Sequence, residues 1–482
     1  MPRLRLGPSL WLDRRTQAPS FPSLHHDVRV EVAIVGGGLT GAAIAWRFAK
    51  AGIRVALIER ARVGRGSTAA STALLMQEPD VDLRELARRY GKARARRVWQ
   101  LSRTATRDFV RTIDQLGIEC DLAERDSLYY ALTPKAIEPL RIEHRLRRRA
   151  GFSGRWLSAA QLSDASGFEG AGAIRTHGNA QIDPYKACLG FTRAAVERGA
   201  QVFERTAVLA GRSRLRTGNW GLGGRESVVL RTPHGSVTAD RVIVATGYAT
   251  ERFKPLAGRF RMLHTYVVGT RRLSRAERRR LGLGAVMLWE TGRPYHYARW
   301  TPDNRLLLGG GDRTRVRGRS RARAFRDGTQ RVTEYFVGLY PALAQIAFEY
   351  AWEGLFAMTP DGLPYIGAHR RYPRHLFALG YGGNGMTFGF LASRLLLDWY
   401  RGKRSADHAT SFFVSSTTTR STSIVQSVMT AAIAPTAARS GAMTAPMTPT
   451  VNGNSAIVRP SCLIITRRTF PSCTSLFTAS TS

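Results

Sequence analysis

The sequence is poor in cysteine and contains no long apolar segment. Four cysteines are spread over 482 residues, with no C-x-x-C pair and no cluster with histidine. This spacing excludes a disulfide framework and a zinc site as organising features, and we expect no metal. No run of about 18 apolar residues is present that would cross a bilayer, and the basic start MPRLRLGPSLWLDRR lacks the apolar centre of a secretory signal. We therefore expect a soluble, cytoplasmic protein without a transmembrane segment.

Acidic residues are scarce relative to basic ones, and arginine supplies most of the excess. The formal net charge is +38, and the arginines gather in runs such as RIEHRLRRR, RRLSRAERRR and RTRVRGRSRARAFR. A nucleic-acid-binding face interleaves aromatic residues with its basic ones, and these runs lack that pattern. We expect a solvated basic surface and no specific nucleic acid, with salt-sensitive non-specific binding from charge alone.

The two ends of the chain lack the pattern of a packed domain. Residues 411–482 contain no lysine, aspartate, glutamate or histidine and are dominated by serine, threonine, alanine and proline. A segment of this composition buries too little apolar surface to fold. It is therefore predicted to be a disordered or aberrant tail, and an out-of-frame gene end is one hypothesis for it. Residues 1–27 are predicted to form an irregular arm.

The stretch EVAIVGGGLTGAAIAWRFAKAGIRVALIER, residues 31–60, reads as strand, glycine turn, helix and strand. Gly36, Gly38 and Gly41 give G-x-G-x-x-G, and Glu59 closes the second strand. The first glycine permits the turn, the second lets a diphosphate approach the backbone, and the third lets the helix pack against the strand. The helix N-terminus offers unpaired N–H groups to phosphate. The pattern predicts dinucleotide binding, with an ordinary tight turn as the alternative.

The remaining pattern alternates between helices and strands. Apolar residues recur at three- and four-residue steps over 81–116, which predicts a helical segment. Strands are expected at 126–132 and 240–248, and short strands alternate over 261–311. Near the far end, GYGGNGMTFG leads into a helical stretch at 386–399. A helix N-terminus after a flexible loop stabilises partial negative charge, such as that on a reduced flavin.

Taken in order, these motifs resemble the D-amino-acid oxidase superfamily of FAD-dependent oxidoreductases, which includes glycine oxidase, sarcosine oxidase, D-amino-acid dehydrogenase and γ-glutamylputrescine oxidase. The motifs that carry the resemblance are the fingerprint, GRGSTAASTALL, RVIVATGY, RLLLGGGD, TPDGLPYIG and ALGYGGNGMTFG. The resemblance implies an α/β fold in which an FAD-binding Rossmann-like domain is interleaved with an antiparallel-sheet substrate domain. The implied FAD-binding domain is discontinuous (28–78, 174–250, 352–410), and the implied substrate domain is formed by 79–173 and 251–351.

The resemblance also implies where FAD binds. It places the diphosphate at Gly36–Gly41, a ribose at Glu59, the adenine at Val208 and the flavin pyrimidine ring at residues 382–387. The stretch EGLFAM lacks the cysteine, and the STAAST loop lacks the histidine, through which relatives attach FAD, so we expect non-covalent FAD. The implied cofactor residues are Gly36, Gly38, Leu39, Thr40, Gly41, Glu59, Arg60, Ser67, Thr68, Ser71, Thr72, Val208, Thr246, Gly247, Gly382, Gly383, Asn384, Gly385, Met386 and Thr387.

The activity implied by the resemblance is oxidation of a C–N bond in a small amine or amino acid, with oxygen or a quinone as acceptor. Strand alternation in RPYHYAR places Arg293, Tyr295, Tyr297 and Arg299 on one face and His296 on the other. If the first face lies over the flavin, it is an aromatic and cationic wall that can hold a substrate carboxylate. The alternative is that this face of the strand points outward, away from the flavin. A second class of function, an RNA-modifying enzyme or a redox subunit of a larger complex, stays open.

Overall fold

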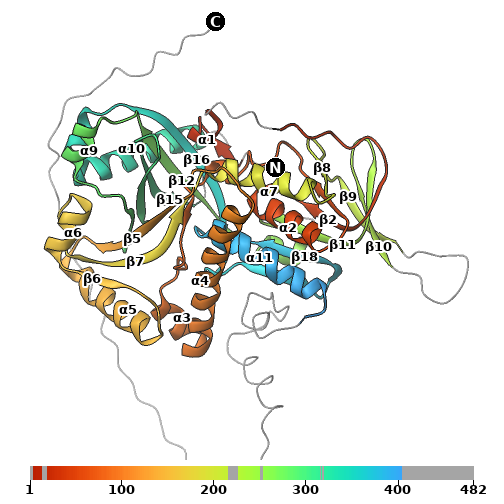
Figure 1. Cartoon of the computed structure of the whole chain (residues 1–482), viewed down its shortest axis with the longest axis horizontal. Helices are drawn as coiled ribbons and strands as arrows, with labels where there is room; N and C mark the ends of the chain where they lie inside the picture. The colour runs from red at the N-terminus through yellow and green to blue at the C-terminus, as the bar shows by residue number, and fades with distance from the viewer. Residues whose placement is uncertain are drawn as a thin grey trace, which may run out of the picture. The chain divides into compact units, whose positions relative to one another are not determined.

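The computed structural model describes residues 4–13, 19–214, 226–249, 253–314, 316 and 320–403, all within one compact unit. They form two β-sheets flanked by helices (Figure 1). The predicted tail at 411–482 lies outside the described residues. The arm at 1–27 contains two elements that its irregular pattern did not predict. A short strand, β1 (Arg5–Leu6), pairs with β16 (Phe348–Met358), and a short helix, α1 (Leu10–Asp13), buries Trp11.

The smaller sheet has the order β17-β18-β11-β2-β3-β8, with β10 pairing β11 and β9. Its strands β2, β3, β8, β11 and β18 run parallel to their neighbours in this series. The stretches VAI in β2, VALI in β3 and VIVA in β11 are continuous buried apolar runs, because a parallel sheet is covered on both faces. The strand bounds are β2 Val28–Val35, β3 Val55–Ile58, β8 Gln201–Phe203, β9 Ala210–Arg214, β10 Ser227–Arg231, β11 Ser236–Gly247, β17 Tyr365–His369 and β18 Tyr372–Leu379.

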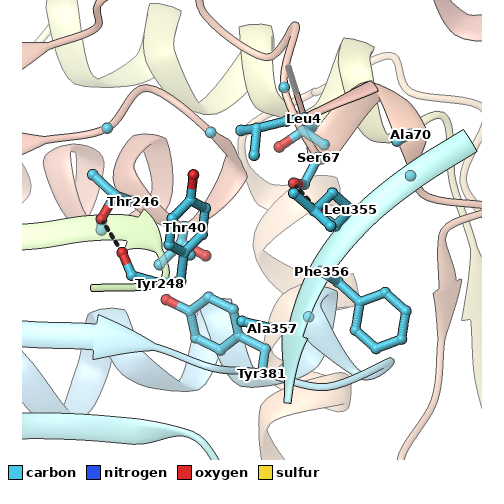
Figure 2. A pocket seen from close by; sticks show the side chains of 18 of the residues that line it. Leu4, Thr40, Ser67, Ala70, Thr246, Tyr248, Leu355, Phe356, Ala357 and Tyr381 are labelled. Atoms are coloured by element: carbon cyan, nitrogen blue, oxygen red, sulfur yellow. Dashed lines mark hydrogen bonds between the residues drawn. The ribbon is translucent and has the colours of Figure 1, made fainter. Parts of the chain in front are cut away.

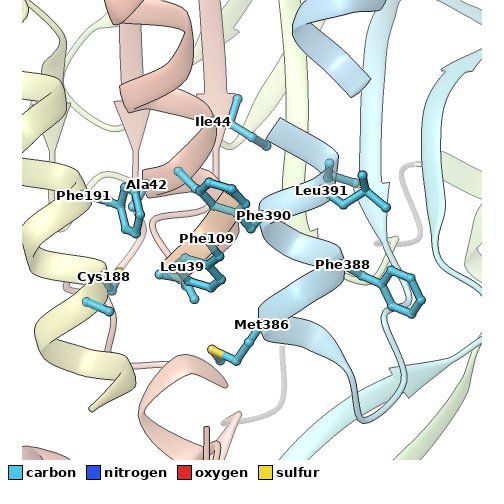
Figure 3. Packing of buried hydrophobic residues seen from close by; sticks show 14 of the residues in the cluster. Leu39, Ala42, Ile44, Phe109, Cys188, Phe191, Met386, Phe388, Phe390 and Leu391 are labelled. Carbon is cyan, nitrogen blue, oxygen red and sulfur yellow. The ribbon is translucent and has the colours of Figure 1, made fainter. Parts of the chain in front are cut away.

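Helices α2 (Leu39–Lys50), α7 (Pro184–Val196) and α11 (Gly385–Tyr400) pack together beside this sheet, and α4 (Lys92–Gln115) packs against α11 (Figure 1). Their apolar faces meet in one cluster (Figure 3). Phe109 of α4 stacks on Phe390 of α11 with ring centroids 4.6 Å apart, and Phe191 of α7 lies 5.7 Å from Phe109. This cluster joins the chain's central and C-terminal helices to the fingerprint helix.

The larger sheet has the order β1-β16-β12-β15-β14-β13-β5-β7-β4, with β6 pairing β7. Its pairs are antiparallel except β13 with β5. The strand bounds are β4 Leu74–Leu75, β5 Ala123–Ala131, β6 Arg155–Leu157, β7 Gly172–Gln181, β12 Arg261–Thr270, β13 Met287–Glu290, β14 His296–Trp300, β15 Leu306–Arg313 and β16 Phe348–Met358. The helices that accompany it in the chain are α3 Leu83–Tyr90, α5 Ile137–Arg149, α6 Ala159–Ser166, α8 Lys254–Ala257, α9 Arg275–Leu281 and α10 Ser320–Leu339.

The expected domain boundaries at 174 and 352 fall inside strands β7 and β16 of the larger sheet. Both strands therefore belong with the sheet that the sequence assigned to the substrate domain. The helical segment expected over 81–116 is two helices, because Gly91 takes a φ of +80° between α3 and α4. No helix among the described residues is long and apolar enough to span a bilayer.

Candidate functional site

A cavity of about 2660 Å³ lies where the carboxyl ends of β2, β3 and β11 meet the larger sheet (Figure 2). This edge of a parallel sheet is where dinucleotides bind in α/β folds. The cavity is continuous from the glycine turn to Tyr295, which immediately precedes β14, and to Tyr297, which lies on β14. Of the predicted cofactor residues, those lining it are Gly36, Gly38, Leu39, Thr40, Glu59, Arg60, Ser67, Thr68, Ser71, Thr72, Val208, Thr246, Gly247, Gly382, Gly383, Asn384, Gly385 and Met386.

The three fingerprint glycines have distinct steric roles. Gly36 has a φ of +112°, and a Cβ there would lie 2.6 Å from the carbonyl oxygen of Ala245. A Cβ on Gly41 would lie 1.9 Å from the carbonyl oxygen of Gly36, so this glycine lets α2 press against the turn. A Cβ on Gly38 would meet just Thr68 Oγ1, at 3.2 Å, and otherwise faces the cavity. The turn therefore keeps open the backbone approach that a diphosphate requires.

Glu59 ties the second strand to this turn. Its Oε2 accepts a hydrogen bond from Gly37 N at 2.7 Å, and its Oε1 accepts one from Ala61 N at 2.8 Å. A carboxylate has about four lone-pair positions, so Glu59 can still accept hydrogen bonds from ribose hydroxyls in the cavity. Thr68 Oγ1 accepts from Leu39 N at 3.0 Å and so fixes the start of α2. The geometry fits a bound dinucleotide.

The segment 67–72 links the two sheets at the cavity. Ser67 Oγ donates to the carbonyl oxygen of Leu355 in β16 at 2.9 Å (Figure 2). Trp352 Nε1 donates to the carbonyl oxygen of Ala70 at 2.8 Å. Across the cavity, Thr246 at the end of β11 donates to the carbonyl oxygen of Tyr248 at 2.8 Å, near Tyr381 (Figure 2). The bonds of Ser67 and Ala70 hold segment 67–72 in place as a polar loop, in a stretch where the sequence shows a run of small residues.

The second glycine element lies at the start of α11. Gly382 and Gly383 line the cavity, and the N–H of Gly383 donates to a carboxylate oxygen of Asp80. Sequence reasoning missed Asp80, because 303 residues separate it from Gly383. Thr387 turns away from the cavity, since its Oγ1 donates to the carbonyl oxygen of Met76 at 2.8 Å and is buried. Thr387 and Gly41 therefore support the site from behind and do not line it.

Two of the four residues of the predicted substrate face line the cavity. Tyr295 and Tyr297 line the cavity. His296 points to the opposite side, as alternation predicts, where it stacks on Tyr335 with ring centroids 3.7 Å apart. Arg293 is exposed and is not among the residues that line the cavity, and its guanidinium lies 5.1 Å from the Tyr295 ring centre.

The expectation that Arg299 faces a substrate is wrong. Its side chain is 1 % exposed and donates to the carbonyl oxygens of Ala73, at 3.2 Å, and Ile182, at 2.9 Å. Its guanidinium lies over Trp11 of the N-terminal arm. The face is the expected one, but β14 continues past the end of the cavity and under the arm, so Arg299 is part of the structural core.

Two carboxyl groups near these tyrosines were also missed. Burial raises the pKa of Asp80 to about 6 and that of Asp312 to about 6. Asp312 directly follows the LLLGGG motif, and its carboxyl interacts with Thr265 and with Asp80. Burial likewise raises the pKa of Tyr297, so its hydroxyl stays protonated at neutral pH. The end of the cavity at Tyr295 and Tyr297 thus combines aromatic rings with the Asp80 carboxyl, and the positive charge of Arg293 opposes the rise in the pKa of Asp80 and Asp312.

Comparison with known proteins supports this geometry. Residues 31–399 match the protein family described as FAD dependent oxidoreductase, DAO. The chain is 28% identical to γ-glutamylputrescine oxidoreductase of Escherichia coli strain K12 over 79% of this chain and 86% of that protein. It is 27% identical to glycine oxidase of Geobacillus kaustophilus strain HTA426 over 78% of this chain and 94% of that protein.

The crystal structure of glycine oxidase from Geobacillus kaustophilus superposes with a TM-score of 0.64 at 24% identity, covering 79% of this chain and 96% of that one. The family match spans the fingerprint and most of both sheets and of α11, and it includes every lining residue of the cavity described above except Leu4 and Arg5. The resemblance seen in the sequence is confirmed: the chain belongs to the D-amino-acid oxidase family of FAD-dependent oxidoreductases, and its cofactor is FAD.

Proposed function

We propose that this enzyme oxidises the C–N bond of an amine or amino acid. The observation that carries the proposal is the continuous cavity, which joins the dinucleotide turn at Gly36 to the tyrosine wall at Tyr295 and Tyr297. Bound FAD would supply the acceptor for the hydride that leaves the carbon bearing the amine, and water would hydrolyse the imine product. The names of the relatives, γ-glutamylputrescine oxidoreductase and glycine oxidase, support this class of substrate.

The residues that would hold FAD follow from the cavity lining. The N-terminus of α2, opened by Gly38, would take the diphosphate, since backbone N–H groups and the helix dipole favour anions there. Glu59 would accept hydrogen bonds from a ribose, and Val208 would contact the adenine. Gly382 and the residues that follow it would lie against the flavin. Because cysteine and histidine are lacking at the two attachment positions, we propose that FAD binds non-covalently.

The substrate end of the cavity would orient the amine and exclude water. The Tyr297 hydroxyl lies 3.2 Å from Thr265 Oγ1, which fixes the ring against the larger sheet. Trp289 also lines the cavity, and Tyr129 stacks on it with ring centroids 3.8 Å apart. These packed rings hold the tyrosine wall rigid, and rigid positioning of a substrate lowers the entropic part of the barrier.

The test is a substrate screen on the purified holoenzyme. Primary and secondary amines and D- and L-amino acids are added without oxygen, and loss of the oxidised-flavin absorbance is followed. At least one amine should reduce the flavin, and added oxygen or a quinone dye should restore it, which also identifies the acceptor. Gly38→Val, in which a branched side chain blocks the phosphate approach, serves as the flavin-free control. Reduction by dithionite but by no amine or amino acid would contradict the proposal.

A further inference from the structure

His264 and Arg321 meet on a buried carboxylate at the wall of the cavity. Both residues line the cavity, although His264 belongs to β12 and Arg321 to the first turn of α10. The Nδ1 atom of His264 shares a hydrogen bond with Oε1 of Glu353 in β16. Arg321 Nε donates to the same Oε1 atom at 3.1 Å and to Oε2 at 3.0 Å. The imidazole and the guanidinium therefore converge on one oxygen atom, and the buried Glu353 fixes both.

The free nitrogen of the His264 ring is open to the cavity. Burial acts to raise the pKa of Glu353, but the hydrogen bonds from His264 and Arg321 outweigh it and hold that pKa below its usual value. The ionised carboxylate accepts hydrogen bonds only, so Nδ1 of His264 carries the proton. None of the described residues hydrogen-bonds to Nε2. Leu355 lies directly opposite His264 in the strand pair, shares its face, and lies beside Ser67 in the cavity (Figure 2).

The Arg321 guanidinium also has unused donors. Its Nε donates to Glu353, whereas its Nη2 is buried and hydrogen-bonds to none of the described residues. The side chain is 17% exposed, so part of the guanidinium can be reached from the cavity. A guanidinium presents its donors in a rigid fork that matches a carboxylate. Because Glu353 occupies one side of this fork, Arg321 is preorganised to bind a second carboxylate on the other side.

The charge around this pair is positive. Glu353 neutralises one positive charge, whereas Arg321 and a protonated His264 carry two. The start of α10 adds the positive end of a helix dipole, and its first turn contains no acidic residue. The acidic residues that line the cavity belong to other segments, the end of β3 and the stretch before α3: Glu59, Glu78 and Asp80. The wall at Arg321 therefore suits an anion.

The other elements around His264 do not reverse this charge. Arg313 lies directly opposite His264 on β15 and is exposed. Burial raises the pKa of Tyr266, on β12, to about 12, so its hydroxyl is uncharged at neutral pH. Asp312 interacts with Thr265, which strand alternation places on the other face of β12 from His264. The remaining charged groups on these elements are basic: Arg5 of β1 and Arg331 of α10.

We propose that Arg321 and His264, fixed by Glu353, form a subsite for a carboxylate group of the substrate. The sequence predicted Arg293 or Arg299 for this role, but neither of them lines the cavity. The substrate class is then an amino acid or another amine that carries a carboxylate, rather than a simple amine. This inference rests on the proposed function for the oxidation of the amine, and it identifies the second group by which the substrate is held.

The experiment measures the binding of valerate and of butylamine to the holoenzyme by calorimetry and by perturbation of the flavin spectrum. The two probes are the amino acid norvaline without its amino group and without its carboxyl group. Valerate should bind the wild type more tightly than butylamine does. Arg321→Leu should weaken valerate binding by about tenfold or more, the range expected for a charged hydrogen bond. The matched control is Arg293→Leu, which removes an exposed arginine outside the lining and should leave valerate affinity unchanged.

The dependence of valerate binding on pH is a second readout. A carboxylate beside Nε2 favours the protonated imidazole, so binding takes up a proton and should tighten as pH falls from about 8 to about 6, the range in which histidine changes charge. His264→Gln should abolish this dependence, which keeps the test decisive if Arg321→Leu does not fold. His296→Gln is the control, because His296 is also held by a carboxylate, with Nδ1 2.5 Å from Glu290, but does not line the cavity.

Three results would overturn the subsite. They are valerate binding no tighter than that of butylamine, unchanged valerate affinity in the folded Arg321→Leu and His264→Gln variants, and an equal loss in Arg293→Leu and Arg321→Leu, which would show a general effect of charge. Failure of the proposed function gives a different result. In that case no amine or amino acid, norvaline included, reduces the wild-type flavin anaerobically, while the binding of valerate still depends on Arg321.

Discussion

Replacing Gly41 or Gly38 with alanine adds the same methyl group at two positions of one turn. We expect Gly41→Ala to reduce mainly the stability of the fold and Gly38→Ala to reduce mainly the affinity for FAD. The backbone permits alanine at both, since neither glycine has a positive φ. At Gly41 the new Cβ would lie 1.9 Å from the Gly36 carbonyl oxygen, more than 1 Å inside the 3.0 Å that real contacts respect. At Gly38 it would meet just Thr68 Oγ1 at 3.2 Å, which yields by a few tenths of an ångström.

The magnitudes follow from these distances. Alanine in a helix gains about 1 kcal/mol over glycine, but forcing α2 off the turn costs roughly 3 kcal/mol or more. Gly41→Ala should therefore lose about 2 kcal/mol of folding free energy. With an unfolding entropy of about 2.1 cal/mol/K per residue over roughly 400 residues, this lowers Tm by about 2–3 °C. Gly38→Ala should change Tm of the FAD-free protein by less, about 1 °C, because glycine is a modestly better N-cap than alanine.

The affinity for FAD should distinguish the two variants in the opposite order, because we expect Gly38→Ala to lose more affinity than Gly41→Ala. The Gly38 methyl group occupies the space through which a diphosphate reaches backbone N–H groups, and charge-assisted hydrogen bonds lost there weaken binding by about ten- to a hundredfold. The assay is calorimetric unfolding of both FAD-free variants, followed by FAD titration with fluorescence quenching as the signal. A Gly41→Ala protein as stable as the wild type, or a Gly38→Ala protein with unchanged FAD affinity, would refute these steric assignments.

Two further predictions follow from the site. Acid precipitation should release all flavin into the supernatant, and flavin retained in the pellet would show a covalent bond. Arg299→Leu should lower the free energy of unfolding by about 2–4 kcal/mol, because two buried carbonyl oxygens lose their donors, whereas Arg293→Leu at an exposed position should leave Tm unchanged in thermal unfolding.

The sequence by itself determined the cofactor class and the nucleotide half of the site. The residues concerned lie close together in the chain: Gly36, Gly38, Gly41 and Glu59. The first glycine permits the turn, the second lets the diphosphate approach, the third lets the helix pack closely, and the glutamate places an acid at the end of the strand. Strand alternation also grouped Tyr295 with Tyr297 on one face, because side-chain direction along a strand has a period of two regardless of tertiary context. The structure showed that these two residues of the face line the cavity. These inferences depend on local geometry, which a single sequence contains.

The tertiary structure decided the substrate half. Alternation gave Arg299 the correct face, but how far the cavity extends along β14 depends on where the N-terminal arm packs. The position of Asp312 depends on an irregular pairing between β12 and β15, and that of Asp80 on a contact with Gly383 on the other side of the fold. Such placements come from contacts between segments that lie tens to hundreds of residues apart. Asp80 and Asp312 carry no periodic signal, so their position near Tyr295 is decided when the two sheets pack together.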